Sequence, residues 1–329
     1  MNILAIRLAR FGDVVLLLPA LTLLKSLVPK CHITFLTDSR LVPLAELCPA
    51  IDDIIPVDRL AMRDGARWHA LKGLARVIRV VRRRTPDVVI DFHGFRETNL
   101  LTWLSRAPKR IGMKRNGEAF LEFCFNLPPV LEDKNLHVRD MFLKMIEVIE
   151  VRGQAETSPL VVPLDSLIWA RENLPARPYA VIYVDAPTPK RIWPPAYFAE
   201  VADHLYGELG LNVVAVAGAR GEPLLHQLKE NAKNPEGIKT LTNLSIPQLA
   251  ATVYTAEFLI SNDTGPMHLG PVLGIPTLGL FSIGLPEHFR PFGKFDRYLR
   301  FDPIEGLRAE EVIREIGELR ATVRRDPQH

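Results

Sequence analysis

The chain has 329 residues, which predicts about two domains at roughly 150 residues per domain. Its hydrophobic fraction of 47% and charged fraction of 24% are typical of globular proteins and exclude wholesale disorder, collagen and coiled coil. The net charge of +3 is too small for a typical nucleic-acid-binding protein, so no nucleic-acid partner is predicted. The scattered cysteines, Cys31, Cys48 and Cys124, form no CxxC pair, which predicts a cytoplasmic protein without a disulfide framework or a thiolate zinc site.

The first half of the chain alternates short apolar runs with helical stretches. Asn2–Ile6 predicts a strand, Gly12-Asp13 is expected to end the loop after it, and a helix is expected to follow to about Leu27. The apolar run within this helix follows two arginines, as in a signal peptide, but it is too short to span a bilayer and predicts a buried helix. The other predicted elements are strands at Cys31–Leu36, Asp53–Val57 and Asp87–Asp91, and a helix at Ala66–Arg84.

A linker at Pro159–Pro163 precedes a second series of the same kind. Such alternation predicts βαβ units and parallel sheets, and therefore an α/β fold of two doubly wound, Rossmann-like domains, residues 1–162 and 163–329. In such sheets ligands bind beyond the carboxyl ends of the strands, so residues that directly follow a strand are candidates for the site. The second series comprises strands at Tyr179–Val184, Asn212–Ala217, Glu257–Ile260 and Thr277–Phe281, and helices at Pro195–Leu209, Glu222–Ala232 and from Gly265 onward.

Charge is divided unevenly between the two halves. Residues 1–163 carry 24 Lys and Arg against 18 Asp and Glu, a net charge of +6. The remainder carries 17 against 20, a net charge of −3, and the two sum to the +3 of the whole chain. A basic first half suggests contact with something anionic, although ordinary variation of the surface would give the same count.

The most specific motif is SNDTGPMH at Ser261–His268, which follows a predicted strand and opens a predicted helix. Asp263, Thr264 or Asn262 can cap that helix, and Gly265 lets a ligand approach the backbone closely. The backbone amides and the helix dipole then favour an anion, above all a phosphate, which His268 could also reach. The alternative is a capped helix with a buried histidine.

Two further motifs follow strands in the second half. Thr188 begins a turn in which Lys190 and Arg191 precede a Trp-Pro helix start, and two cations there suit a diphosphate. The alternative is a solvated basic turn with a packing tryptophan. Glu222 closes the turn after the strand that ends at Ala217, where a carboxylate could accept hydrogen bonds from ribose hydroxyls or simply begin a helix. The usual dinucleotide and P-loop fingerprints are missing.

A fourth candidate lies where the first strand meets the first helix. Arg10, Gly12 and Asp13 occupy this position, and an aspartate there could act as a general base or serve as a helix cap. HExxH, GxSxG and clustered Cys/His patterns are absent from the sequence, so hydrolase and zinc-enzyme readings lack support.

Together these segments resemble one family in its motif order over nearly the whole chain, the ADP-heptose:lipopolysaccharide heptosyltransferases of glycosyltransferase family 9. The resemblance rests on GDVV at Gly12–Val15 with LPAL at Leu18–Leu21, on VIDFHG at Val89–Gly94, on Arg191-x-Trp-Pro, and on SNDTGPMH. The family's lysine before x-Trp-Pro is Arg191 here, with Lys190 one place earlier, and its small Gly-rich turn reads Asp185-Ala186-Pro187.

The resemblance implies a GT-B fold, with two domains facing across a cleft, and an inverting glycosyltransferase that needs no metal or other cofactor. The implied donor is ADP-L-glycero-D-manno-heptose, held by the second domain, and the implied acceptor is the anionic, lipid-linked Kdo/heptose inner core of lipopolysaccharide, held by the first. Such an enzyme would work peripherally at the cytoplasmic face of the inner membrane. A nucleotide-sugar epimerase of the same architecture and a two-domain solute-binding protein are the alternatives. The implied roles are Asp13 as base, Arg10, Gly12 and His93 on the acceptor side, and Thr188, Lys190, Arg191, Glu222, Asp263, Thr264, Gly265 and His268 around the donor.

Overall fold

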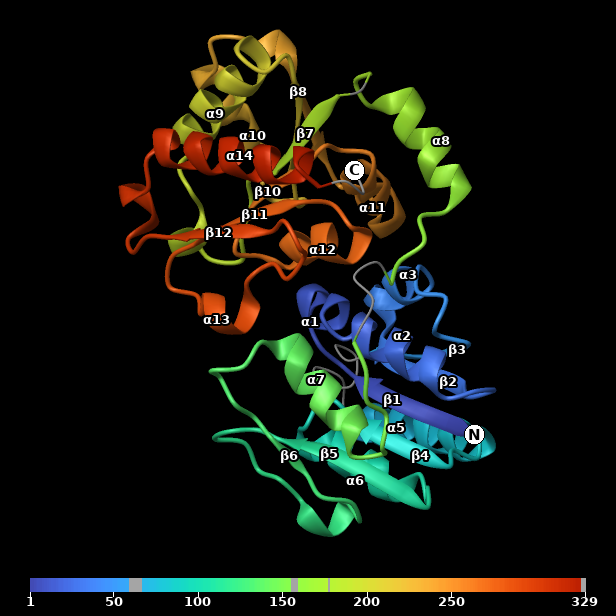
Figure 1. The fold of residues 1–329 in the computed structure, drawn as a ribbon. Helices are drawn as coiled ribbons and strands as arrows, with labels where there is room; N and C mark the ends of the chain where they lie inside the picture. Colours follow the sequence, from blue (N-terminus) through green and yellow to red (C-terminus); the bar gives the residue numbers. More distant parts are fainter. Residues whose placement is uncertain (59–66, 155–158, 177, 327–329) are drawn as a thin grey trace. The chain divides into compact units, whose positions relative to one another are not determined.

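A computed structural model describes residues 1–58, 67–154, 159–176 and 178–326. The chain forms two compact units, Met1–Pro159 and Leu160–His329, coloured blue to green and green to red in Figure 1. The sequence placed the division between residues 162 and 163. Each unit contains one six-stranded sheet among the described residues, and each sheet carries helices on its faces.

The sheet of unit 1 is parallel and has the strand order β3-β2-β1-β4-β5-β6. The chain reverses its direction of winding between β1 and β4, which are neighbours, and this switch point is where such sheets bind ligands. The strands are β1 (Asn2–Arg7), β2 (His32–Asp38), β3 (Asp53–Val57), β4 (Val88–Asp91), β5 (Lys109–Lys114) and β6 (Val130–Leu131). The helices are α1 (Phe11–Val15), α2 (Leu18–Leu27), α3 (Val42–Ala45), α5 (Arg67–Arg83), α6 (Arg96–Leu104) and α7 (Val138–Glu147).

The sheet of unit 2 is also parallel, with the order β12-β11-β10-β7-β8-β9 and a switch point between β7 and β10. Its strands are β7 (Tyr179–Tyr183), β8 (Asn212–Ala217), β9 (Ile238–Thr242), β10 (Leu259–Asn262), β11 (Thr277–Phe281) and β12 (Arg297–Arg300). Its helices are α8 (Leu164–Asn173), α9 (Pro195–Gly207), α10 (Glu222–Asn231), α11 (Ile246–Tyr254), α12 (Leu269–Leu273), α13 (Pro286–Phe289) and α14 (Ala309–Arg324).

Most predicted elements are confirmed, and two helices differ. The single helix expected up to Leu27 is two helices, α1 and α2, because Pro19 lies in the first turn of α2 and cannot donate the hydrogen bond that a continuous helix needs. The helix expected from Gly265 begins as a 3-10 turn, η5 (Gly265–His268), and continues as the five-residue α12. The helix expected from Ala66 is confirmed from Arg67, since residue 66 lies outside the described residues. The strands β5, β6, β9 and β12 were not predicted.

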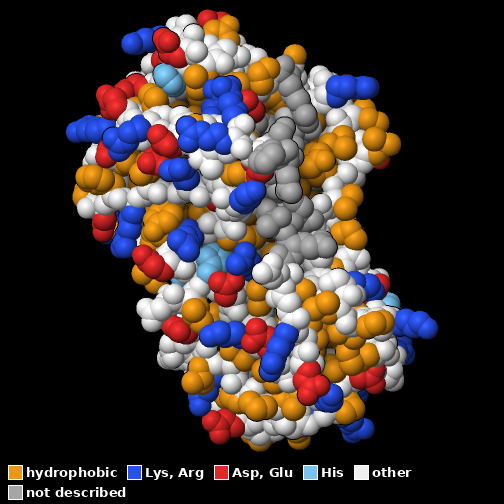
Figure 2. All heavy atoms as spheres, in the orientation of Figure 1, with side chains coloured by type: hydrophobic (Ala, Val, Ile, Leu, Met, Phe, Trp, Pro, Cys, Tyr) orange, Lys and Arg blue, Asp and Glu red, His pale blue; other side chains and the backbone are white. Residues whose placement is uncertain are grey.

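The surface is charged and mixed. On the face shown in Figure 2, side chains of both signs are interspersed with apolar ones over both units. Among the described residues, no helix combines the length and the hydropathy that a bilayer crossing requires.

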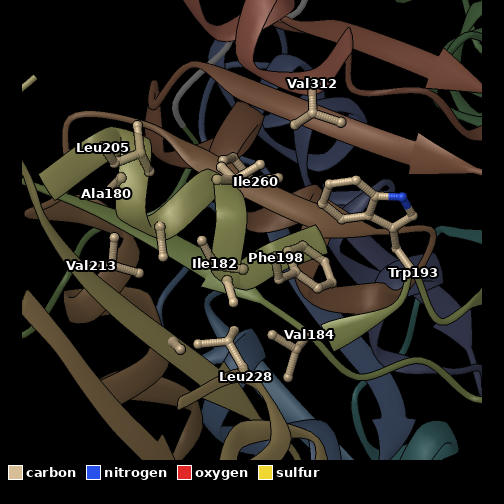
Figure 3. Close-up of a cluster of buried hydrophobic side chains, with 14 of the residues drawn as sticks. Ala180, Ile182, Val184, Trp193, Phe198, Leu205, Val213, Leu228, Ile260 and Val312 are labelled. Carbon is tan, nitrogen blue, oxygen red and sulfur yellow. The ribbon is translucent and has the colours of Figure 1, made fainter. Parts of the chain in front are cut away.

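Trp193 belongs to the buried core of unit 2 and is 0% exposed (Figure 3). Its ring meets that of Phe198 of α9 edge to face, with 4.7 Å between ring centroids, and its Nε1 donates to the carbonyl of Leu307 at 2.9 Å. An indole that is both buried and hydrogen-bonded fixes the chain on either side of it. The basic turn just before Trp193 is therefore anchored by the core.

Candidate functional site

Asp13 of unit 1 is held by an arginine that ends β1. The Nη2 atom of Arg7 donates to Oδ1 of Asp13 at 2.9 Å, and its Nη1 donates to the carbonyl of Phe92 at 2.5 Å. The side chain of Arg7 is 3% exposed and that of Asp13 is 28% exposed. Burial lowers the pKa of Arg7 and the charge of Asp13 opposes this shift. Asp13 therefore presents a carboxylate to solvent with one oxygen fixed from inside.

The alternative reading of Asp13 as a helix cap is wrong. Arg10 occupies the N-cap position of α1, and Asp13 lies in the first turn with its Oδ1 bonded to Arg7. Arg10 itself is exposed, and Gly12 is buried inside α1. Asp13 thus owes its orientation to the strand beneath it and not to the end of its own helix.

The loop after β4 is built on a buried carboxylate. Oδ1 of Asp91 accepts from the amides of His93 and Gly94, both at 3.0 Å, and its Oδ2 accepts from Nδ2 of Asn99 at 2.9 Å. Burial raises the pKa of Asp91, and these hydrogen bonds oppose the shift. His93 is only 3% exposed and its ring lies against that of Phe95. Because Arg7 bonds to the carbonyl of Phe92, this loop and Asp13 belong to one network.

Two arginines of this network escaped the sequence analysis as site residues. Arg7 belongs to it directly, and Arg115 donates from Nε to the carbonyl of His93 at 2.7 Å and lies 3.6 Å from the carboxylate of Glu132. For Arg7 the available signal was a charged residue at the end of an otherwise apolar strand, β1. Arg115 directly follows β5, a strand that the sequence did not predict, so no such signal marked it.

The carboxyl ends of β7 and β10 in unit 2 are pinned together by a buried amide. Nδ2 of Asn262 donates to the carbonyl of Val184 at 2.8 Å, and its Oδ1 accepts from the amide of Trp193 at 3.2 Å. The hydroxyl of Ser282 donates to the carbonyl of Lys190 at 2.6 Å. These bonds hold the basic turn at the switch point of the sheet, where a ligand is expected.

Arg191 and Asp263 form an ion pair at this switch point. Nη1 of Arg191 lies 3.2 Å from Oδ2 of Asp263, whose side chain is 7% exposed, whereas that of Arg191 is 32% exposed. Burial raises the pKa of Asp263, and the charge of Arg191 opposes the rise. A methyl group at Gly284 would collide with this carboxylate, so the glycine permits the pair.

Lys190 is exposed and has no ion pair within the described part of the chain, and Thr188 beside it is exposed as well. The two cations of the turn therefore differ. Arg191 is aimed by a buried partner, whereas the side chain of Lys190 extends into solvent. Because Lys190 is not held by an ion pair, its side chain can turn toward an anion that binds at this site.

The half-buried backbone at Thr264–Gly265 is the next candidate part of the site. Thr264 occupies the N-cap position of η5 with extended backbone and without a side-chain cap. In the described chain, the amides of Thr264 and Gly265 have no backbone acceptor, and Pro266 carries no amide hydrogen. His268 is 4% exposed at the end of η5. Because η5 and α12 are short, individual amides and not a long helix dipole would hold an anion here.

A cavity of about 280 Å³ opens at the carboxyl ends of β7 and β8. Neighbouring strands lie about 4.8 Å apart, so this cavity is roughly 10 Å from the end of β10, about the span from a diphosphate to its nucleobase. Glu222 lines a separate cavity of about 490 Å³ between α10 and β9. The walls of the smaller cavity are Tyr183, Val216, Ala217, Gly218, Ala219, Asn243, Leu244 and Leu249.

The predicted residues fall into two groups, one in each unit. Asp13 and His93 belong to the network of Arg7, and Arg191, Asp263, Thr264, Gly265 and His268 lie at the end of β10 or against it. Glu222 lies two strands away from β10. Within the described ranges, no group of three or more His, Cys, Asp or Glu side chains is arranged to hold a metal ion.

Comparison with known proteins gives one consistent result. Residues 74–306 match the sequence profile described as "Glycosyltransferase family 9 (heptosyltransferase)". Lipopolysaccharide heptosyltransferase 1 of Pseudomonas aeruginosa is 25% identical over 92% of this chain and 84% of its own. The structure of the glycosyl transferase family 9 protein of Veillonella parvula has a TM-score of 0.82 at 24% identity, covering 97% of this chain and 96% of that one. E. coli heptosyltransferase WaaC, solved with ADP, has a TM-score of 0.79 at 21% identity, covering 97% and 100%. These likenesses confirm the predicted GT-B fold.

Proposed function

The chain belongs to glycosyltransferase family 9, the heptosyltransferase family, and from this membership we propose that it transfers heptose from ADP-L-glycero-D-manno-heptose to the Kdo or heptose region of the lipopolysaccharide inner core. Relatives that align over most of the chain carry the name lipopolysaccharide heptosyltransferase. The observation that carries the proposal furthest is the meeting of Arg191, Asp263 and the Thr264–Gly265 amides at the switch point of unit 2.

The donor half of the proposal concerns unit 2. The diphosphate would accept hydrogen bonds from the amides of Thr264 and Gly265 and be neutralised by Lys190 and Arg191. Burying a diphosphate without counter-charge is costly, and two cations on an anchored turn supply that charge. The nucleobase would enter the cavity beside β8, and Glu222 is our candidate for the ribose hydroxyls. Thr188 and His268 complete the proposed surroundings of the donor.

The acceptor half of the proposal concerns unit 1, whose net positive charge suits a phosphorylated and carboxylated acceptor. Asp13 would be the general base. The acceptor hydroxyl oxygen forms a bond to the anomeric carbon from the face opposite the ADP, and its proton passes to the carboxylate of Asp13. The bond between the anomeric carbon and the β-phosphate oxygen breaks, ADP leaves with the electron pair, and the configuration is inverted. Arg10, Gly12 and His93 would line the acceptor side.

Charge develops on the departing ADP, and preorganised donors at that point commonly supply several kcal/mol. We assign this role to the Thr264 and Gly265 amides together with Arg191 and Lys190, without a metal ion or other cofactor. Turnover should therefore persist in EDTA. Complete loss of activity in EDTA, restored by magnesium, would contradict this assignment.

Because the proposed acceptor is anchored in a lipid leaflet, we also propose that the protein works in the cytoplasm, peripherally at the inner membrane. Its partners would then be the nucleotide sugar and the anionic lipid-linked oligosaccharide, without nucleic acid.

A thermal-shift panel of ADP, UDP, GDP and CMP tests the donor class. At a hundredfold excess over its Kd, a nucleotide stabilises the protein by about 2.7 kcal/mol, and we expect this from ADP alone. A shift with UDP and none with ADP would contradict the assignment. The family match does not favour an epimerase or a solute-binding protein. The first would convert the donor without any acceptor, and the second would bind ligand without turnover, so incubation with and without acceptor separates all three.

A further inference from the structure

Helix α5 carries basic side chains and no acidic ones. The sequence of Arg67–Arg83 contains six Lys and Arg and no Asp or Glu. Its apolar side packs on the core of unit 1 through Val77, Ile78 and Val80, so its charged side faces outward. Arg76, Arg79 and Arg83 are exposed, and none of them pairs with a carboxylate within the described chain. An arginine stripe with no counter-charge of its own is arranged to meet an anionic surface.

An exposed aromatic pair is formed between α6, the next helix along the chain, and a 3-10 turn that follows β5. Trp103 of α6 is 47% exposed and Phe123 of η2 (Glu122–Cys124) is 62% exposed. Their rings meet edge to face with 5.9 Å between centroids, and Leu100 on the same helix is 37% exposed. Two large aromatic side chains that contact each other at the surface form a contiguous apolar patch, which differs from isolated exposed apolar residues. Tryptophan in particular is enriched where protein meets the interface of a bilayer.

The stripe and the aromatic pair belong to one surface. Nε of Arg82, in the last turn of α5, donates to the carbonyl of Leu104 at 2.8 Å, directly beside Trp103. The ends of α5 and α6 therefore lie side by side on the same face of the sheet. The nearby acid Glu122 is paired with Lys114 at 3.1 Å, which leaves the balance of this surface positive.

We propose that this surface, formed by Arg76, Arg79, Arg83, Trp103 and Phe123, docks unit 1 on an anionic lipid bilayer. The arginines attract phospholipid head groups, and the aromatic rings enter the interface between head groups and acyl chains. Stable attachment without a spanning helix needs two such signals, and this surface combines them.

The inference rests on the proposed function in one respect. A lipid-linked acceptor would explain why the protein binds a membrane. Helix α6 begins just after the His93 loop, and Trp103 lies seven residues further on, which is about 11 Å along the axis. The acceptor side of unit 1 would then stand above the bilayer by roughly that distance. This spacing suits an acceptor whose reacting sugar is separated from its lipid by other sugars.

Flotation of the full chain with phosphatidylglycerol vesicles tests the surface without any substrate. We expect the wild type to bind these vesicles, to bind neutral phosphatidylcholine vesicles weakly, and to be released by high salt. The variant Arg76→Ser, Arg79→Ser, Arg83→Ser should bind about a hundredfold more weakly, and Trp103→Ala, Phe123→Ala at least about tenfold. The lysine triple Arg76→Lys, Arg79→Lys, Arg83→Lys should bind nearly as the wild type does, which separates lost charge from lost folding.

The matched control removes the same charge from a helix of unit 2, as Arg314→Ser, Arg324→Ser, Arg325→Ser, whose side chains are also exposed. This control should bind the vesicles as the wild type does, and an equal loss in both triples would overturn the proposal. It would also be overturned if the wild type ignored the vesicles, or bound a short RNA and not lipid. Turnover on an acceptor freed of its acyl chains should be unchanged in the docking variants. Failure of that reaction in the wild type would overturn the proposed function and leave the vesicle result standing.

Discussion

Arg7 and Asp13 form a pair in which a buried cation fixes a half-exposed carboxylate. Nη1 of Arg7 donates a hydrogen bond to the carbonyl of Phe92, at the end of the neighbouring strand, and Nη2 donates one to Oδ1 of Asp13. Its guanidinium also lies 5.1 Å from the centre of the Phe142 ring. Three separate contacts leave the guanidinium little freedom, so the orientation of Asp13 is set by β1, β4 and α7 together.

Asp13→Asn should leave ADP affinity within a few-fold of the wild type and lower turnover by about 10² or more, the usual scale for a general base. The amide is isosteric but cannot accept the proton of the acceptor hydroxyl. Calorimetric titration of ADP and initial rates with acceptor give the two numbers. Wild-type turnover in this variant would show that Asp13 has no part in the chemistry.

Arg7→Lys should act on turnover through Asp13. A lysine supplies one compact charge and cannot reach Phe92 and Asp13 with two separate arms, so the carboxylate loses its fixed orientation. We expect turnover to fall about tenfold and ADP affinity to stay unchanged, with a loss of stability of roughly 1–3 kcal/mol from the carbonyl left without its donor. In the Asp13→Asn background, Arg7→Lys should cost little further turnover. A full tenfold loss there would mean that Arg7 acts independently of Asp13.

The double variant Lys190→Ala, Arg191→Ala should lose more in turnover than in ADP affinity. If the pair stabilises the leaving group, its charge matters more in the transition state than in the ground state. The single variants should be unequal, and we expect Arg191→Ala to be the worse, because Asp263 already aims its guanidinium at the switch point. Rates and ADP affinities of the three variants provide the check. If Lys190 and Arg191 only form a solvated surface turn, neither turnover nor ADP affinity should fall.

The sequence predicted both sheets because their central strands are short, apolar and bounded by helices. It missed the edge strand β12, whose four residues are Arg297, Tyr298, Leu299 and Arg300, and whose burial alternates from one residue to the next. It also missed β5, which begins and ends with lysine. Charged residues within these two strands weaken the apolar signal on which strand prediction depends.

The motifs marked the site, but they could not show how its parts are connected. Arg7 and Phe92 are 85 residues apart, and their hydrogen bond exists only because β1 and β4 are neighbours in the sheet. The pair of Arg191 and Asp263 likewise depends on β7 lying beside β10. Local patterns identify residues that follow strands, whereas the order of the strands decides which of them meet.

Asp296 should make the stability of unit 2 depend on pH. Burial raises its pKa to about 7, and its carboxylate accepts from the amides of Thr277 and Gly293. An acid whose pKa is higher in the folded than in the unfolded state contributes most to the free energy of unfolding at a pH below its unfolded pKa, near 4. This contribution to stability falls as the pH rises to 7. At about 1.4 kcal/mol per pH unit, this fall amounts to up to about 4 kcal/mol.

The variant Asp296→Asn should lack this pH-dependent fall in the free energy of unfolding. The amide replaces only one of the two acceptors, which changes stability by an amount that does not vary with pH. Denaturant unfolding at pH 4 to 8 should therefore show a difference between wild type and variant that changes steadily up to about pH 7. A matched change at the exposed Asp165 should leave the profile unaltered, and a constant difference at Asp296 would contradict the raised pKa.

Gly94→Ala should destabilise unit 1 more than the same change at Gly117. Both glycines have positive φ, +73° and +79°, so an alanine at either position is strained by about 1 kcal/mol. A Cβ at Gly94 would also lie 2.5 Å from the carbonyl oxygen of Met113 in β5, whereas at Gly117 it would meet nothing within 4 Å.

Because the collision at Gly94 is with backbone, relief requires the His93 loop or β5 to move, and the loop is tied down by Asp91. We expect a total loss of roughly 3 kcal/mol for Gly94→Ala and about 1 kcal/mol for Gly117→Ala, measured by denaturant unfolding. Turnover should fall in the first variant alone, since the loop adjoins the carbonyl that positions Arg7. Equal losses of stability would mean that the loop can withdraw from β5 without cost, and the fixed geometry around Asp13 would then have to come from Arg7 and α7 alone.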